Sequence, residues 1–197
     1  IDAQRIHDFG AKGVILSGGP ESVHAENSPR INDAVFELGV PVLGICYGMQ
    51  AMADRFGGQV HASDIHEFGA ATIEVNGHSQ LTDGIEDSKT DGAAAKLNVW
   101  MSHGDKVIKA PEGFDIVAST PSCPIAIMAN DDKKYYGLQF HPEVTHTLQG
   151  QALLGRFVHQ ICDCAGEWTP DNIADMRIAQ LKEQIGDKQV LLGLSGG

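Results

Sequence analysis

The chain of 197 residues, 42% of them hydrophobic and 20% charged, is long enough to bury one sizeable core with an appendage. Its 26 acidic residues against 14 basic ones leave a formal net charge of -12, which argues against nucleic acid as a partner. No apolar run approaches the ~20 residues that span a bilayer, and the first residues do not resemble a secretory signal. The sequence therefore predicts a cytoplasmic protein with no membrane partner.

Short apolar runs alternate with helical stretches in the first part of the chain. This alternation is typical of crossover connections between the strands of a parallel sheet. Apolar residues that recur every three to four positions indicate the helices. The elements expected in chain order are a strand at 13–16, a helix at 30–38, a strand at 40–45 and a helix at 47–56.

From residue 69 onward the pattern changes to strands separated by turns, with Asn76-Gly77 as one of the turn signals. Residues 83–96 are polar and rich in Gly and Ala, which indicates a surface loop. The further elements expected are strands at 71–75, 97–101, 114–119, 125–129 and 135–140, and a helix at 149–162. Residues 1–165 are therefore expected to form a three-layer α/β domain with a mixed, mostly parallel sheet.

A second domain is expected over 166–197, beginning with a linker. Thr169 can cap a helix that has Pro170 at its first position and that extends to about residue 185. The apolar run at 190–194 predicts a strand, which is followed by the Gly-rich end of the chain. Both ends are expected to be truncated, since the chain starts without Met inside a helical pattern and stops at a Gly-rich turn directly after the apolar run.

The segment Gly44-Ile45-Cys46-Tyr47-Gly48 lies between a predicted strand and a predicted helix. Small residues around a nucleophile permit the tight, strained turn of a nucleophile elbow. A thiol at that turn lies beside the positive end of a helix, which favours the thiolate. A buried structural cysteine flanked by glycines needed for packing is the alternative interpretation of the pentapeptide alone.

A candidate base and its partner occur in Gln139-Phe140-His141-Pro142-Glu143, at the end of a predicted strand. In extended backbone His141 and Glu143 project from the same side, so the carboxylate can orient the imidazole and stabilise its cation. With Cys46 these residues supply a nucleophile, a base and an orienting group. A lone histidine would more often be structural.

The turn Ser17-Gly18-Gly19-Pro20 also follows a predicted parallel strand, where open α/β sheets build their sites. A glycine N–H there can point at a substrate atom, although a plain tight turn explains the same residues. The other cysteines and the scattered histidines lack the spacing of a metal site, so no metal is expected.

Three motifs occur in a characteristic order: Ser-Gly-Gly-Pro at 17–20, Gly-Ile-Cys-Tyr-Gly-Met-Gln at 44–50 and Gln-Phe-His-Pro-Glu at 139–143. Together they resemble the class I glutamine amidotransferases, over residues 13–164. Within that family, residues 100–105 and 141–147 are similar to the GMP synthase branch. The closing residues 192–197 resemble the opening of the pyrophosphatase loop in the second domain of that branch. Family members have a strand and a helix before the residue that is Ile1 here.

This resemblance implies the three-layer fold of the family and a Cys-His-Glu triad of Cys46, His141 and Glu143. Cys46 would be the nucleophile, His141 the general acid and base, and Glu143 its partner. The implied reaction hydrolyses glutamine to glutamate and ammonia. The ammonia would pass to xanthosine monophosphate, activated with ATP in a synthetase domain, to make GMP. ATP and Mg²⁺ are implied for the complete enzyme, and no cofactor for this chain.

Further residues receive roles from the same resemblance. Gly19 and Tyr47 would supply oxyanion N–H groups, and Gln50 would hold the glutamine substrate. Ser102 and His103 would line the glutamine pocket or face the synthetase domain, or they would simply form a turn after a strand. The start of the nucleotide loop would be Ser195, Gly196 and Gly197.

Two alternatives remain open from the residues. The chain could be the ammonia-supplying component for carbamoyl phosphate or anthranilate, although the terminal Ser-Gly-Gly after a strand argues against this. It could also be a non-catalytic module that keeps the fold and regulates a synthetase, which the complete set of triad residues disfavours.

Overall fold

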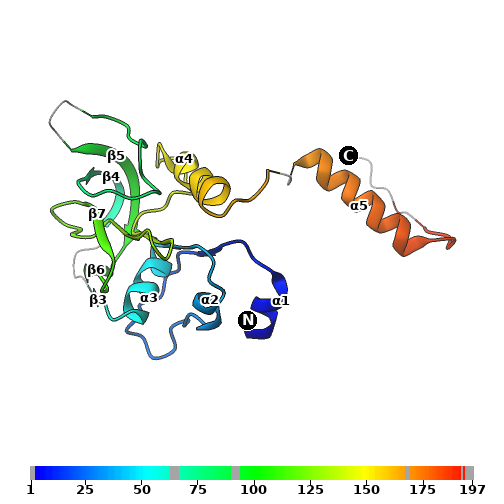
Figure 1. Ribbon diagram of the computed structural model, residues 1–197, viewed down its shortest axis with the longest axis horizontal. Helices are drawn as coiled ribbons and strands as arrows, with labels where there is room; N and C mark the ends of the chain where they lie inside the picture. The colour runs from blue at the N-terminus through cyan, green and yellow to red at the C-terminus, as the bar shows by residue number, and fades with distance from the viewer. Residues whose placement is uncertain (1–2, 63–66, 90–93, 167–168, 192, 194–197) are drawn as a thin grey trace. The chain divides into compact units, whose positions relative to one another are not determined.

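The computed structural model of the chain describes residues 3–62, 67–89, 94–166, 169–191 and 193. The internal contacts divide the chain into two units, Ile1–Cys164 and Ala165–Gly197 (Figure 1). All the strands of the described residues belong to the first unit. They are β1 (Val14–Leu16), β2 (Val42–Ile45), β3 (Gln59–His61), β4 (Glu67–Val75), β5 (Ala95–His103), β6 (Lys106–Lys109), β7 (Asp115–Ser119), β8 (Ile127–Asn130) and β9 (Tyr135–Leu138).

The main sheet has seven strands in the order β1-β2-β9-β8-β7-β4-β5, and β3 pairs with β6 in a separate two-stranded sheet. Within the main sheet β1, β2 and β9 pair in parallel. Leu16 is paired with Gly44 of β2, and Gly44 is paired with Gly137 of β9. The carboxyl ends of these three strands therefore meet at one edge of the sheet, where open α/β sheets place their sites.

The predicted mixed sheet is confirmed, and parallel pairing between neighbouring strands is confined to one side of it. Strands β1, β2, β9, β7 and β5 run in one direction and β8 and β4 in the other. Only the pairs β1·β2 and β2·β9 are parallel neighbours among the described strands, because the later strands are joined by turns that favour antiparallel pairing.

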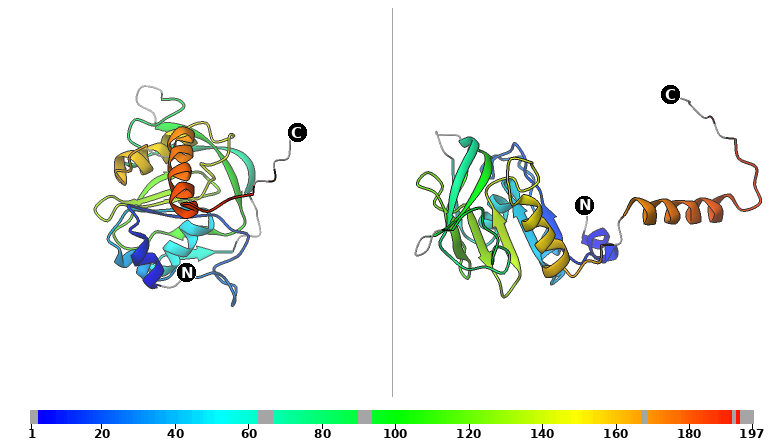
Figure 2. Two further views of the ribbon diagram at one scale, coloured as in Figure 1. Left: turned by 90° about the vertical axis from the view of Figure 1, so that its right-hand side faces the viewer. Right: turned by 90° about the horizontal axis from the view of Figure 1, so that it is seen from above.

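Helices cover both faces of the sheet, as Figures 1 and 2 show for α3 and α4. Ile6, Val35 and Met52, from the first three helices, pack in one apolar cluster with Val42 of β2. The helices are α1 (Ala3–Phe9), α2 (Ala34–Glu37), α3 (Tyr47–Arg55), α4 (Gly150–Gly155), a π-helix η1 (Arg156–Ile161) and α5 (Pro170–Ile185).

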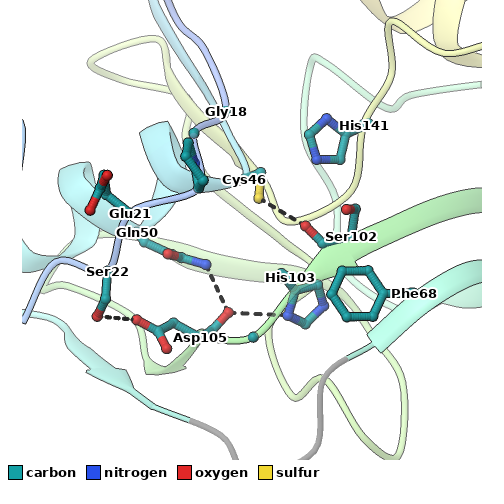
Figure 3. Close-up of a pocket in the computed structure, with 13 residues that line it drawn as sticks. Gly18, Glu21, Ser22, Cys46, Gln50, Phe68, Ser102, His103, Asp105 and His141 are labelled. Carbon is teal, nitrogen blue, oxygen red and sulfur yellow. Dashed lines mark hydrogen bonds between the residues drawn. The ribbon is translucent and has the colours of Figure 1, made fainter.

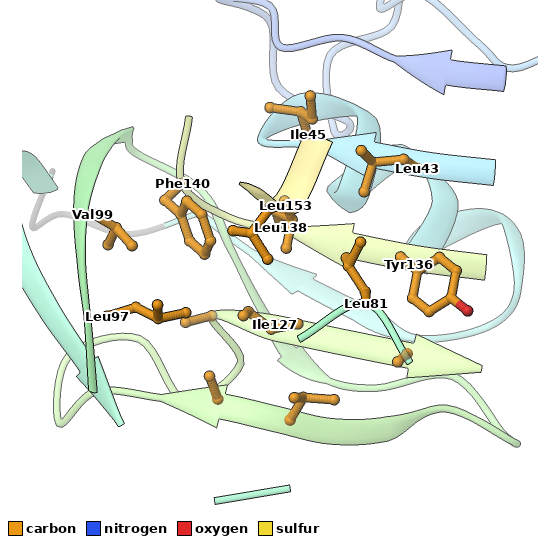
Figure 4. Close-up of a cluster of buried hydrophobic side chains, with 14 of the residues drawn as sticks. Leu43, Ile45, Leu81, Leu97, Val99, Ile127, Tyr136, Leu138, Phe140 and Leu153 are labelled. Carbon is orange, nitrogen blue, oxygen red and sulfur yellow. The ribbon is translucent and has the colours of Figure 1, made fainter. Parts of the chain in front are cut away.

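A second cluster fills the opposite face of the sheet, where Leu43, Tyr136 and Leu138 pack under Leu153 of α4 and Phe157 of η1 (Figure 4). Successive residues of a strand point to opposite faces, so neighbours such as Val42 and Leu43 enter different clusters. The three-layer α/β architecture is therefore confirmed.

Local elements differ from the sequence expectation in a few places. The helix expected at 30–38 is reduced to α2, because the Asn32 side chain accepts a hydrogen bond from the Ala34 N–H (3.0 Å) and forms a turn there. The expected loop at 83–96 ends at Ala95, where β5 begins its nine-residue pairing with β4. The short strands β3 and β6 were not predicted.

The unit Ala165–Gly197 contains α5, whose start agrees with the sequence pattern. The Thr169 hydroxyl accepts a hydrogen bond from the Asn172 N–H (3.2 Å), and Pro170 opens the helix. Residues 190, 191 and 193 are not in a strand, contrary to the expectation. A strand needs a neighbour to pair its backbone groups, and no strand of the described residues pairs here. Ser195, Gly196 and Gly197 lie outside the described residues.

Candidate active site

Cys46 occupies a strained turn between β2 and α3. Its backbone has φ 50° and ψ -108°, a conformation that residues with a side chain rarely adopt. The Cys46 N–H donates to the Leu138 carbonyl oxygen (2.7 Å), which ties the turn to β9. The first helical hydrogen bond runs from the Gln50 N–H to the Cys46 carbonyl oxygen (3.1 Å). The thiol is therefore placed at the N-terminus of α3, as a nucleophile elbow requires.

The two glycines around Cys46 are required by close backbone approach. A Cβ on Gly44 would lie 2.7 Å from the backbone of Gly48, and a Cβ on Gly48 would lie 2.1 Å from the Leu16 carbonyl oxygen. Atoms cannot approach this closely, so α3 can start directly over β1 and β2 only if both positions lack a side chain. This close packing of α3 on the sheet accompanies the strained backbone of Cys46.

We expect Gly48→Ala to destabilise the fold by about 3 kcal/mol, since the added methyl group must displace backbone. Gly155→Ala is the matched control, because a Cβ there meets nothing within 4 Å and the residue has helical φ and ψ. That change is expected to be neutral or to stabilise by about 0.5–1 kcal/mol. Urea unfolding of both variants measures the difference, and equal stabilities would contradict the packing argument.

His141 lies just beyond the end of β9, with Glu143 beside it. The Nδ1 atom of His141 is 2.6 Å from Oε1 of Glu143. The His141 side chain is mostly buried, whereas that of Glu143 is half exposed. The interaction with Cys46 is the largest influence on the pKa of the imidazole, and together with Glu143 it outweighs burial and raises the pKa of His141 to about 9. Cys46 and Glu143 therefore both stabilise an imidazolium at this position.

Strand β5 forms the wall beside the thiol. The Cys46 Sγ donates a hydrogen bond to the Ser102 carbonyl oxygen (3.5 Å), and Figure 3 shows Ser102 next to Cys46 and His141. His103 follows with its side chain buried, Nδ1 being 3.1 Å from the Asp105 carbonyl oxygen and Nε2 3.8 Å from Oε2 of Glu67. Burial lowers the pKa of His103, and Glu67 opposes that shift.

A cavity of about 620 Å³ opens over the thiol (Figure 3). It is large enough for an amino-acid substrate. Gly18 lines it from the turn after β1 and Phe68 from β4, and no Lys or Arg side chain is among its lining residues within the described part of the chain. Its lining includes these candidates from the sequence: Gly19, Cys46, Gln50, Ser102, His103 and His141.

Gln50 lines the cavity, and hydrogen bonds hold its side chain in place. Its Nε2 atom donates to the Asp105 carbonyl oxygen (2.7 Å) and lies 3.4 Å from Oε1 of Gln139. The Asp105 carboxylate accepts a hydrogen bond from the Ser22 hydroxyl. Figure 3 shows the contacts of Asp105 with Gln50 and Ser22, which link α3, the turn between β5 and β6, and the segment that follows β1. Neither Ser22 nor Asp105 was singled out from the sequence, although Asp105 closes the motif at 100–105.

The turn after β1 places its two glycines differently. A Cβ on Gly18 would lie 2.9 Å from Cε1 of His141 and 3.5 Å from the Cys46 Cβ, so Gly18 is the closer of the two to the reactive groups. Gly19 instead faces the Tyr47 ring at 3.8 Å. The Tyr47 side chain is buried, and its hydroxyl donates to the Pro29 carbonyl oxygen (2.6 Å). The oxyanion role that the resemblance assigns to Gly19 concerns its N–H group and stays a prediction.

A family model for class I glutamine amidotransferases matches residues 1–161. The chain belongs to this family. Over all 197 residues the amidotransferase is 85% identical to a glutamine-hydrolyzing GMP synthase from Psychrobacter arcticus, and 60% identical to one from Pseudomonas fluorescens. It spans 36% and 38% of the lengths of these two relatives, and its matched residues correspond to their glutamine amidotransferase part.

Solved structures agree with this assignment of the fold. The amidotransferase has a TM-score of 0.65 and 28% identity with a Thermoplasma acidophilum protein proposed to be one component of a GMP synthase, over 92% of this chain and 81% of that one. A glutamine amidotransferase from Thermotoga maritima has a TM-score of 0.54 at 22% identity, over 88% and 72% of the two chains. The second likeness supports the fold alone.

Two searches of the described residues returned no candidates. No group of three or more His, Cys, Asp or Glu side chains in the described part of the amidotransferase is arranged to hold a metal ion. Among the same residues, no helix has the length and apolar content needed to cross a membrane.

Proposed function

We propose that this chain hydrolyses glutamine to glutamate and ammonia through a triad of Cys46, His141 and Glu143. The observation that carries the proposal is the convergence of three sequence-distant motifs on one cavity, with the thiol at a strained elbow and an imidazole whose pKa is raised beside it. The family match over residues 1–161 supplies the reaction class.

The proposed reaction proceeds through a covalent thioester. The Cys46 thiolate attacks the side-chain amide carbon of glutamine, and the carbonyl oxygen becomes an oxyanion. Collapse of this intermediate expels ammonia, to which His141 gives its proton. His141 then removes a proton from water, which attacks the thioester and releases glutamate and the free thiol. Glu143 keeps the imidazole oriented and stabilises its protonated form.

Other residues are assigned supporting roles in the same proposal. The N–H of Tyr47, at the start of α3, and the N–H of Gly19 would donate to the oxyanion. Gln50, Ser102 and His103 line the cavity and would contact the rest of the glutamine molecule. The Gln50 carboxamide is held by its hydrogen bond to the Asp105 carbonyl oxygen, so it offers a rigid polar contact for the substrate.

The fate of the ammonia is proposed from the names of the relatives. In a glutamine-hydrolyzing GMP synthase, ammonia would aminate xanthosine monophosphate that a synthetase domain has activated with ATP and Mg²⁺. The closing Ser195, Gly196 and Gly197 would belong to the nucleotide loop of that domain. The amidotransferase itself would need no cofactor, and the complete enzyme is proposed to be cytoplasmic.

The test is a coupled assay with this chain and a separately made synthetase part of the Psychrobacter arcticus relative. We expect glutamate release that rises about tenfold when the synthetase part, ATP and xanthosine monophosphate are added, a coupling of ordinary size. GMP should form with glutamine as well as with ammonium salts. GMP from ammonium salts only, without glutamate release from folded chain, would favour a regulatory module. A rate of glutamate release that is the same with and without the synthetase part would favour the glutaminase component of another amidotransferase.

A further inference from the structure

The outer edge of β5 is occupied by the segments that carry the reactive residues. The other edge of β5 pairs with β4, in a register that sets Trp100 opposite Ala70. On the outer edge, the Trp100 carbonyl oxygen accepts from the His141 N–H (3.0 Å), and the Ser102 carbonyl oxygen accepts from the Cys46 thiol (3.5 Å). Alternate residues of one edge strand therefore hold both His141 and Cys46.

A threonine hydroxyl completes the link between β5 and His141. The Trp100 N–H donates to Oγ1 of Thr147 (3.0 Å), and the same hydroxyl donates to the His141 carbonyl oxygen (2.6 Å). In a direct strand pair the Trp100 N–H would bond to the His141 carbonyl itself. Here one oxygen atom is inserted between these two groups, while the reverse bond from His141 to Trp100 stays direct.

The surroundings of Thr147 hold this hydroxyl in place. Thr147 is 3% exposed, and its N–H donates to the Val144 carbonyl oxygen (3.1 Å). The loop that contains Thr147 folds back so that Gly150 lies against Pro142. A Cβ on Gly150 would lie only 2.0 Å from the Pro142 carbonyl oxygen. The Leu148 N–H donates to the carbonyl oxygen of Asn98 (3.2 Å), which is two residues before Trp100 in β5.

From this geometry we infer that Thr147 is a positioning residue for His141: its hydroxyl sets the distance between the histidine and β5, and thereby the approach of the imidazole to the Cys46 thiol. The inference rests on the proposed glutaminase function and adds to it a residue that does not line the cavity. Loss of the hydroxyl leaves the Trp100 N–H and the His141 carbonyl without this partner in a partly buried place, so the backbone at His141 is expected to shift to satisfy them.

The test compares Thr147→Val, which removes the hydroxyl at nearly constant shape, with Thr147→Ser, which keeps it. We expect Thr147→Val to lower kcat for glutamine hydrolysis about 10- to 100-fold with KM changed less than about threefold, as for a misplaced acid–base group. Thr147→Ser should stay within about threefold of the parent. Thr82→Val is the matched control, since Thr82 is also buried with its hydroxyl near a carbonyl oxygen and does not line the cavity.

A second measurement does not depend on activity. NMR titration of the His141 ring should show its pKa near 9 in the parent, Thr147→Ser and Thr82→Val chains, and a lower pKa in Thr147→Val, because the nearby Cys46 is the main cause of the raised value. An unchanged pKa in Thr147→Val, or a kcat that falls equally in Thr82→Val, would overturn the inference. A parent chain without Cys46-dependent hydrolysis would instead refute the proposed function, and the titration would still decide the role of Thr147.

Discussion

Cys46→Ala is expected to lower the rate of glutamine hydrolysis at least about 10,000-fold, because the proposed reaction has no route to the thioester without the thiol. The substitution removes one sulfur atom from a turn that is held by backbone packing at Gly44 and Gly48, so the fold should persist. Glutamate release from the parent and the variant, with the synthetase part present, measures the effect. Thermal unfolding of both chains checks that the variant is folded.

Cys164→Ala is the matched control for this prediction. Cys164 is a free cysteine that does not line the cavity, and its removal should change the rate by less than about twofold. A thiol reagent provides a second reading, because burial raises the pKa of Cys123 to about 12 and that of Cys162 to about 11 and so slows their modification. Glutamine should protect Cys46 from the reagent. Hydrolysis that survives in folded Cys46→Ala would refute the covalent mechanism.

His141→Ala is expected to lower kcat about 100- to 10,000-fold, the usual contribution of a positioned general acid and base. Glu143→Gln should have a smaller effect on the rate and a clear effect on its pH dependence. The interactions with Cys46 and Glu143 raise the pKa of His141 to about 9, so activity that needs the imidazolium should fall as the pH rises through that value. Loss of the Glu143 charge removes one of these causes and should move the alkaline limb of kcat/KM to lower pH.

The pH dependence of stability must be measured alongside that of activity. The pKa of His141 in the folded chain lies above its ordinary value of 6.5, so its interactions stabilise the fold fully below pH 6.5. That stabilisation is lost as the pH rises through about 9. Unfolding curves across this range separate it from the catalytic limb. His159→Gln is the control for His141→Ala, since His159 lies outside the cavity. An alkaline limb of kcat/KM that does not move in Glu143→Gln would contradict the role assigned to Glu143.

Much of the local structure follows from neighbouring residues. Thr169 and Pro170 predict the start of α5, because a capping hydroxyl and a fixed φ act within one turn of helix. The glycines around Cys46 predict a tight strand-to-helix turn for a similar reason, and the turn has the strained backbone expected of it. Helix α2 is shorter than its apolar pattern suggests, because the Asn32 side chain competes locally for the backbone.

The sequence by itself determined the fold class, the strand ends at which the three motifs lie, and the candidate residues Cys46, His141 and Glu143. It did so because strand alternation, turn residues and side-chain chemistry are local properties of the chain. Only the tertiary structure decided that the outer edge of β5 lies against Cys46 and His141, that the turn after β1 brings Gly18 close to both residues, and that Thr147 joins His141 to Trp100. These contacts join residues far apart in sequence, and their partners are chosen by strand order and register, which no local pattern specifies.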